Sequence, residues 1–198
     1  MNKKTLILVA VIAVVAIVVL WLAGGYNKMV VEQENVETAW GQVENQYQRR
    51  MDLIPNVVNT VKGAANYEKS TLEAVVEARA KATSLTIDPS NMTEEQLAQF
   101  QNAQAEISQS LSRLLVTVEQ YPDLKANTNF QSLITELEGT ENRIAIARNT
   151  FNDAAKAYNT LIRRFPNNIV AGIFGFEKKP YFKAEQGAEK APKVDLEF

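Results

Sequence analysis

The 198-residue sequence predicts an all-α protein, with an N-terminal transmembrane helix followed by an antiparallel four-helix bundle whose first and last helices are long. Three observations support this prediction. Leu6–Ala23 is an unbroken run of 18 apolar residues, apolar residues then recur every three or four positions, and capping and turn residues divide the region into segments. We therefore divide the chain into a cytoplasmic stub with the transmembrane helix (1–25), a helical bundle (26–165) and an apolar patch with a C-terminal tail (166–198).

The apolar run Leu6–Ala23 is long enough to cross a bilayer. As a helix it spans about 27 Å, close to the ~30 Å of a hydrocarbon core. No charged residue lies between Thr5 and Asn27, and Trp21 and Tyr26 lie where interfacial aromatic residues are expected. A cleaved signal peptide and a buried core helix are the alternatives, but the run is long for the first and would need burial on all sides for the second. We expect a retained anchor that contacts the lipid bilayer.

The charges around this run predict its orientation. Lys3 and Lys4 precede it, whereas the 15 residues that follow it carry Lys28 and three glutamates. Because basic residues are retained on the cytoplasmic side, we expect a cytoplasmic N-terminus in the cell (inner) membrane, with the bundle on the outer side. Without Lys3 and Lys4 the body holds 19 basic and 23 acidic residues, a net charge of −4. The absence of Cys also suits an oxidising compartment.

The first bundle helix is predicted by one apolar stripe that continues through Pro55, where we expect a kink rather than an end. Gly63 and Asn66 are candidates for a C-cap and the following N-cap. The stripe consists of Val36, Trp40, Val43, Tyr47, Met51, Ile54, Val58, Val61 and Ala65.

A shorter second helix is expected at about 67–82, with Leu72, Val75 and Val76 facing inward, followed by a loop at 83–92. Thr93 and Gln96 then form a capping-box pattern, and the residues on either side, Met92 and Leu97, a hydrophobic staple. The third helix carries a heptad seam of Leu97, Phe100, Gln104, Ile107, Leu111, Leu114, Val118 and Tyr121, and ends before Pro122.

The last long helix is predicted from about Thr128 to Phe165, a rod of roughly 55 Å that cannot bury its apolar stripe alone. Its seam is Phe130, Leu133, Leu137, Thr140, Ile144, Ala147, Phe151, Ala154, Tyr158, Leu161 and Phe165. Four helices with short connections can cover one another as an antiparallel bundle.

The tail contains an apolar run, Ile169–Phe176, that is too short to span a bilayer. It either folds back onto one end of the bundle or forms a surface for the membrane interface, a second protomer or a partner. The candidate contact patch is Ile173, Phe174, Phe176, Tyr181 and Phe182. Beyond it, Lys183–Pro192 is polar, and Val194, Leu196 and Phe198 alternate with acidic residues, a pattern that could add as a strand to a partner or pack on the bundle.

The composition excludes many chemistries. The chain has no Cys and no His, so it has no thiolate nucleophile, no imidazole base and no His or Cys metal ligand. The near-neutral charge argues against nucleic-acid binding, and no glycine-rich phosphate loop or nucleophile elbow is present. We therefore predict no enzymatic activity, no cofactor and no metal.

Three stretches resemble the LemA family: AWGQVENQYQRRMDLIPNVVNTVKG (39–63), VEQYPDLKANTNFQSLITELEGTENRIAIARNTFNDAAKAYN (118–159) and FPNNIVAGIFGF with the following PYF (165–182). The resemblance implies a bacterial single-pass membrane protein with a four-helix body and no established catalytic activity. It also implies a partner-dependent role beside a membrane metalloprotease or a TPM-domain protein. The 83–92 loop carries no family wording.

Charged residues within these stretches form a candidate polar cluster for structure or for a partner. The first interpretation is a surface that grips a partner or ligand; the second is pairing between helices, with Glu138 or Glu141 facing an arginine of the first helix. A Glu-x-x-Glu metal site is disfavoured because ferritin-like sites use Glu-x-x-His. The residues are Arg49, Arg50, Asp52, Glu138, Glu141, Asn142, Arg143 and Arg148.

Taken together, the sequence predicts a non-catalytic, membrane-anchored scaffold or adaptor for other envelope proteins. The alternatives are a self-assembling protein that organises the membrane surface, which would form homo-oligomers, and an unrecognised enzyme.

Overall fold

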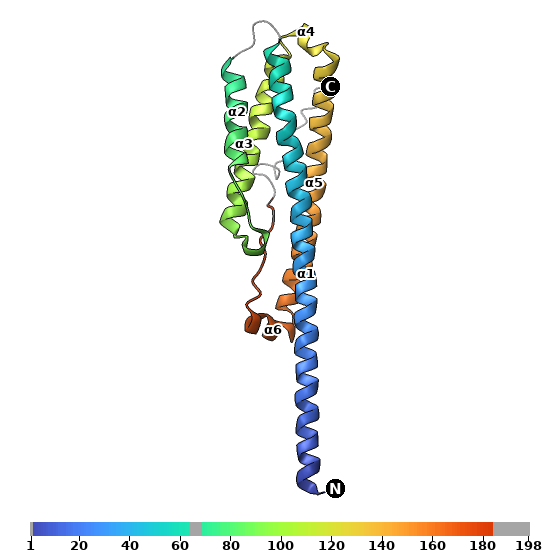
Figure 1. Ribbon diagram of the computed structural model, residues 1–198. Helices are drawn as coiled ribbons and strands as arrows, with labels where there is room; N and C mark the ends of the chain where they lie inside the picture. Colours follow the sequence, from blue (N-terminus) through green and yellow to red (C-terminus); the bar gives the residue numbers. More distant parts are fainter. Residues whose placement is uncertain (1, 64–68, 184–198) are drawn as a thin grey trace, which may run out of the picture.

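The computed structural model describes residues 2–63 and 69–183, and within them the chain is helical with no strand. The all-α class is thereby confirmed. The four longest helices run alternately up and down along a common direction (Figure 1). The helices are α1 (Lys3–Lys62), α2 (Lys69–Thr83), the 3₁₀ helix η1 (Pro89–Asn91), α3 (Glu94–Val118), α4 (Pro122–Lys125), α5 (Thr128–Arg163) and α6 (Asn167–Phe174).

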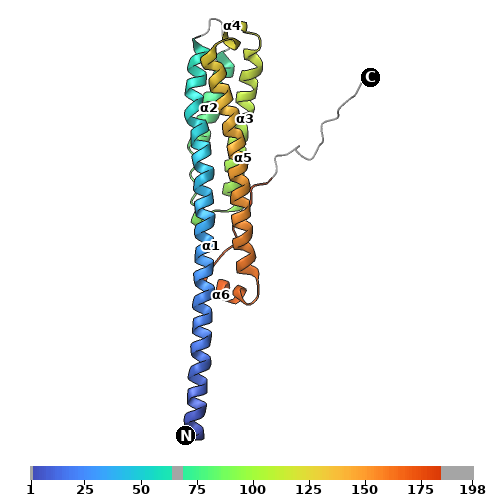
Figure 2. The same ribbon diagram turned by 90° about the vertical axis from the view of Figure 1, so that its right-hand side faces the viewer.

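Helix α1 joins the apolar run and the first bundle helix into one helix of 60 residues. It continues through Pro55, as predicted, and ends at the expected Gly63. The N-terminal part of α1 extends beyond all other elements in both views (Figures 1 and 2). This part is long and apolar enough to cross a membrane, and none of it is buried within the protein.

The helices associate as two antiparallel pairs. Helix α1 packs along α5, and α2 packs along α3. The shorter α2–α3 pair covers the end of the α1–α5 pair that is remote from the N-terminus (Figure 1), and α2 also contacts α1. Helix α4 lies in the connection from α3 to α5, between the predicted end of the third helix at Pro122 and the start of the last at Thr128.

The interior contains two separate hydrophobic cores. The proximal core, nearer the N-terminal apolar segment, includes Trp40, Phe100, Phe151 and Tyr158. The distal core includes residues of α1, α2, α3 and α5 such as Ile54 and Leu114. The buried polar residues Arg50 and Thr140 fall in sequence between the two cores on α1 and α5, and Gln104 directly follows Ala103, the first distal-core residue of α3. The bundle thus has a polar layer between two apolar ones.

The start of α3 has the predicted capping box. Thr93 Oγ1 accepts a hydrogen bond from the Gln96 amide at 3.1 Å, and Gln96 Oε1 accepts one from the Thr93 amide at 3.0 Å. Met92 and Leu97 are both buried in the proximal core. Two amide donors that α3 itself cannot satisfy are therefore paired locally.

We expect Thr93→Ala to lower the free energy of unfolding by about 1 kcal/mol, because one of these donors loses its acceptor. The measurement is chemical denaturation in detergent followed by circular dichroism. Thr135→Ala is the control, since Thr135 is an exposed residue within α5 whose hydroxyl donates to the Gln131 carbonyl of the preceding turn. A loss at Thr93 no larger than that at Thr135 would contradict the capping role.

The predicted inward position of Val76 is wrong, because this side chain is 49% exposed. Leu72 and Val75 are buried as predicted. The buried positions of α2 are completed by Ala78 and Ala82, which shifts the centre of the buried face away from Val76. Among the described helices α2 packs mainly against α3, and to a lesser extent against α1, so a single narrow face suffices.

The seam of α5 also departs from the prediction in its last third. Ala155 and Ile162 are buried where strict heptad spacing placed Ala154 and Leu161. A straight helix has 3.6 residues per turn, so a heptad stripe drifts by about 20° per repeat. Helix α5 ends at Arg163, and Phe165 is 78% exposed rather than part of the seam, because Pro166 disfavours helical geometry at the residue before it.

Candidate functional site

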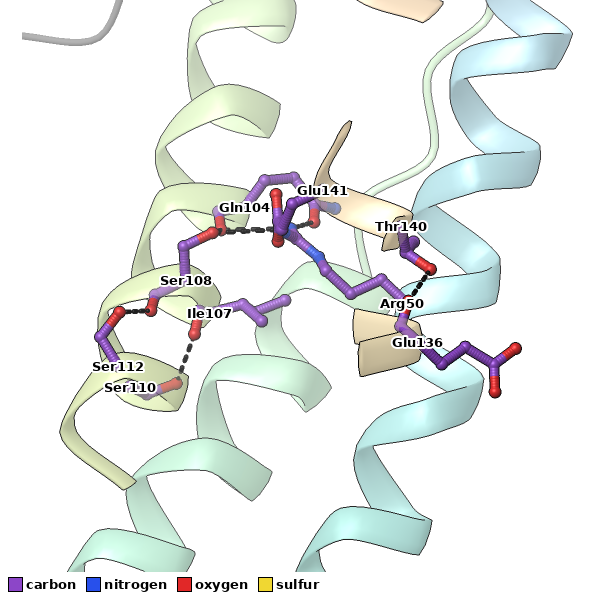
Figure 3. Close-up of polar contacts among 9 residues, drawn as sticks. All are labelled: Arg50, Gln104, Ile107, Ser108, Ser110, Ser112, Glu136, Thr140 and Glu141. Atoms are coloured by element: carbon purple, nitrogen blue, oxygen red, sulfur yellow. Dashed lines mark hydrogen bonds and ion pairs between the residues drawn. The ribbon is translucent and has the colours of Figure 1, made fainter. Parts of the chain in front are cut away.

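The polar layer is organised around Arg50, whose residue surface is 1% exposed. Its side chain extends from α1 toward α3 and α5, as Figure 3 shows. We define the central polar cluster as Arg50, Gln104, Ser108 and Glu141.

The guanidinium of Arg50 bonds both neighbouring helices. Its Nη1 donates to Ser108 Oγ at 3.0 Å and to the Glu141 carboxylate. Its Nη2 donates to the backbone carbonyl of Gln104 at 3.2 Å and to the side-chain oxygen of the same residue. The guanidinium also lies 5.1 Å from the ring centroid of Tyr47. One side chain thereby links α1, α3 and α5 through charge-assisted hydrogen bonds.

The other predicted cluster residues lie apart from this centre. Arg49 pairs with Glu136, not Glu138, at 2.7 Å on the surface. The half-buried Arg143 donates to Thr140 Oγ1 at 2.9 Å, within α5. Arg148 donates to the Lys183 carbonyl at 3.0 Å. The remaining three members, Asp52, Glu138 and Asn142, are exposed as well.

Of the eight predicted residues, Arg50 and Glu141 are joined directly. Glu138 and Glu141 do not form a shared carboxylate site, and no three Asp or Glu side chains of the described chain are placed to hold a metal ion. The Nη1 and Nη2 donors of Arg50 are directed at protein groups of α3 and α5, so the cluster is suited to holding helices together.

Sequence reasoning missed Gln104 and Ser108 as members of this cluster. Gln104 did carry a signal, because it is a polar residue in an otherwise apolar heptad seam. A glutamine at such a position needs a buried hydrogen-bond partner. Ser108 follows four residues later on the same helix face, where a second acceptor can reach the same guanidinium.

An open groove of about 800 Å³ adjoins the cluster and runs between α3 and α5. Its lining is mostly polar: Arg50 and Glu141 contribute to it together with Gln101, Ser108 and Arg148. Gln101 and Arg148 both donate to the carbonyl of Lys183, which closes one part of the groove.

A second set of polar contacts holds the segment after α6. We name Gly175–Lys183 the strap; it runs back along α5 in the opposite direction. Asn159 donates to the Lys179 carbonyl at 2.8 Å and accepts from the Lys179 amide at 2.9 Å. Asn152 makes the same pair of bonds with Phe182, at 3.1 and 2.9 Å. The side-chain amides of two asparagines in α5 thus pair with backbone N–H and C=O groups of the strap, as the backbone of a neighbouring strand would.

The side chain of Lys179 fixes the loop before α3. Its Nζ donates to the carbonyls of Pro89 and Ser90 at 2.9 and 2.5 Å. Burial lowers the pKa of Lys179, and the negative charges of Glu37, Asp88 and Glu177 partly oppose this effect. The strap therefore connects α5 with the η1 region as well as with the core.

The candidate contact patch is divided by the fold. Phe182 is buried in the proximal core against Trp40 and Phe151, so it does not belong to a surface patch. Phe176 is half-buried, whereas Ile173, Phe174 and Tyr181 are exposed. The polar stretch after Lys183 and the alternating C-terminus lie outside the described residues.

We expect Asn159→Ala to lower the free energy of unfolding by about 1–3 kcal/mol, because it leaves a buried amide and a buried carbonyl of Lys179 without partners. Denaturant titration measures the loss, and hydrogen exchange at the Lys179 amide should accelerate. Asn142→Ala is the control, since Asn142 is an exposed asparagine of the same helix. Equal effects of the two substitutions would argue against the role of Asn159 in fixing the strap.

Comparison with known proteins supplies several relatives. Magnetosome protein MamQ 2 of Paramagnetospirillum magneticum is 27% identical over 93% of this chain and 74% of the relative. Magnetosome protein MamQ of Magnetospirillum gryphiswaldense is 27% identical over 90% of this chain and 72% of its own length. Protein LemA of Metamycoplasma hominis is 24% identical over 82% of this chain and 71% of that protein.

The family model of LemA matches residues 39–196. The match begins one residue before Trp40 of the proximal core and includes the central polar cluster, both asparagines that hold the strap, and α6. The residues that organise the structure are thus those that the family model covers, and the chain belongs to the LemA family.

Proposed function

We propose that this protein is a membrane-anchored, non-catalytic scaffold or adaptor for other proteins of the bacterial envelope. The observation that carries this proposal is that several charged residues of the LemA-like stretches form hydrogen bonds or ion pairs with other parts of the same protein. Arg50 and Glu141 bond across helices, Arg49 bonds Glu136, and Arg148 bonds the strap. These contacts hold the helices and the strap in place, which is a structural role rather than a catalytic one.

The relatives are consistent with this proposal. Two of them are named as magnetosome proteins, and none of the three names states a reaction. A protein whose task is contact needs a stable body, an anchor and exposed surface. The bundle, the apolar part of α1 and the outward faces of α3 and α5 provide these three parts.

We place the anchor, Leu6–Ala23, across the inner membrane with the N-terminus in the cytoplasm and the bundle outside. The chain has no Cys, so maleimide labelling of a single engineered cysteine shows on which side of the membrane that residue lies. A cysteine at the exposed Ser132 of α5 should react with a membrane-impermeant maleimide in intact cells. Reaction only after the cells are broken would reverse the orientation.

Photo-crosslinking in native membranes tests the adaptor role. A benzophenone amino acid at Glu138 or Asn142 samples exposed positions of α5, and the same probe at the exposed Val116 samples α3. We expect discrete adducts with other proteins, among which a membrane metalloprotease or a TPM-domain protein is the first candidate. Ladders at multiples of the chain's own mass would instead favour the self-assembling alternative.

A further inference from the structure

Helix α6 lies beside α1 at the point where the apolar run ends. A Cβ atom added to Gly25 would be 3.4 Å from Val170 Cγ2, so the two helices approach closely there. The Tyr26 ring packs against the rings of Phe174 and Phe176, with centroids 4.9 and 5.6 Å apart. In both overall views α6 lies across the lower end of the bundle, next to α1 (Figures 1 and 2).

One face of α6 is covered and the other is not. Val170 and Ala171 are buried in the proximal core. Ile169 and Ile173, four residues apart and therefore on one side of the helix, are 48% and 63% exposed. Phe174 and the preceding Phe165 are also exposed. The eight residues of α6 include no charged side chain, and its polar side chains are the two asparagines at its start. The exposed face is therefore largely apolar.

Helix α6 contacts α1 at the position along its axis where the headgroup layer of a bilayer is expected. If Leu6–Ala23 fills a hydrocarbon core, the layer beyond it is about 5–8 Å thick, which corresponds to roughly three to five residues of helix. Gly25 and Tyr26, the residues that contact α6, fall in this interval. Exposed basic residues lie nearby in sequence, with Arg163 and Arg164 before α6 and Lys28 on α1.

We propose that α6 is an interfacial helix, whose face of Ile169 and Ile173, with Phe165 and Phe174, inserts into the headgroup–acyl boundary of the bilayer that α1 crosses. The lipid is chosen as the partner because the exposed apolar run of α1 ends at Ala23, two residues before Gly25, where α6 contacts α1. Short apolar faces beside basic residues bind such boundaries by burying apolar area and attracting anionic lipid. The inference rests on insertion of α1, which belongs to the proposed function.

Depth measurement by spin labelling tests this inference on the full-length chain. We would place single cysteines at Ile173, at Val14 in the apolar run and at Ser132 on α5, and label each with a nitroxide. The proteins are reconstituted into vesicles of phosphatidylcholine and phosphatidylglycerol. Collisions with oxygen and with a water-soluble nickel chelate give the depth of each label. Circular dichroism checks that each labelled protein keeps its helix content.

We expect the ratio of oxygen to nickel collisions at Ile173 to exceed that at Ser132 severalfold and to lie below that at Val14. A water-like ratio at Ile173 with a membrane-like ratio at Val14 would overturn the inference and leave the anchor intact. A water-like ratio at Val14 would instead count against the anchor itself. Spin–spin broadening at Ile173 that disappears on dilution with unlabelled protein would assign the face to a second copy of the chain and overturn the lipid assignment.

Discussion

Arg50→Ala is expected to lower the free energy of unfolding by about 2–5 kcal/mol, because it truncates a large buried side chain and removes hydrogen-bond donors from buried acceptors. The guanidinium bonds Gln104, Ser108 and Glu141, and Gln104 is itself buried. Its removal leaves a cavity between α1 and α3 and an amide without its partner. Glu141 is better able to recover water, because its side chain is 45% exposed.

The neighbouring Arg49 provides a matched control. It also pairs with a glutamate of α5, at 2.7 Å, but both side chains of that pair are about half exposed. Arg49→Ala should therefore cost less than ~1 kcal/mol. Urea titration in detergent micelles measures both variants. Arg50→Lys should recover only part of the loss, since an ammonium cannot present the same planar set of donors. Equal losses for Arg49→Ala and Arg50→Ala would refute the central role of Arg50.

Trp40→Ala is expected to have a similar effect, about 3–5 kcal/mol, through loss of apolar contacts and the cavity that remains. The Trp40 ring lies 5.4 Å from Phe100, 5.6 Å from Phe151 and 6.0 Å from Phe182, centroid to centroid. These three rings belong to α3, α5 and the strap. Loss of Trp40 should therefore also weaken the attachment of the strap to the bundle.

The two measurements for this variant are the free energy of unfolding and hydrogen exchange at the Phe182 amide, which should accelerate. Trp21→Ala is the control, because Trp21 lies on the apolar part of α1 and is 37% exposed. We expect Trp21→Ala to leave the unfolding of the bundle unchanged. Unaltered exchange at Phe182 in the Trp40→Ala protein would mean that the polar contacts of the strap hold it without Trp40.

Much of the fold could be predicted because its information is local and periodic. The stripe from Val36 to Val61 is buried as predicted, and the Thr93–Gln96 capping box forms because its two partners are three residues apart. The errors arise where helical periodicity continues in the sequence but the helix has ended or its face has no neighbouring helix. Val76 is apolar but lies on a side of α2 that no helix covers, and Phe165 follows the end of α5.

The polar contacts were predictable only in part. An arginine of the first helix and Glu141 could be expected to pair because both lie near the middle of long antiparallel helices. The strap could not be found in this way, since its extended backbone bonds to Asn152 and Asn159 and has no periodic pattern of its own. Phe182 looked like a surface residue for the same reason, although it completes the proximal core.

Because α1 is one continuous helix, a change in the tilt of its membrane segment also tilts the bundle about the membrane surface. Residues 24–62 extend about 58 Å beyond the apolar run. A tilt of the membrane segment by about 20°, a common response to bilayer thickness, would swing the far end of the bundle sideways by roughly 20 Å. Helix α6 contacts α1 at Gly25, two residues beyond the end of the apolar run. Bilayer thickness would in this way set how far from the anchor axis the bundle's tip can reach.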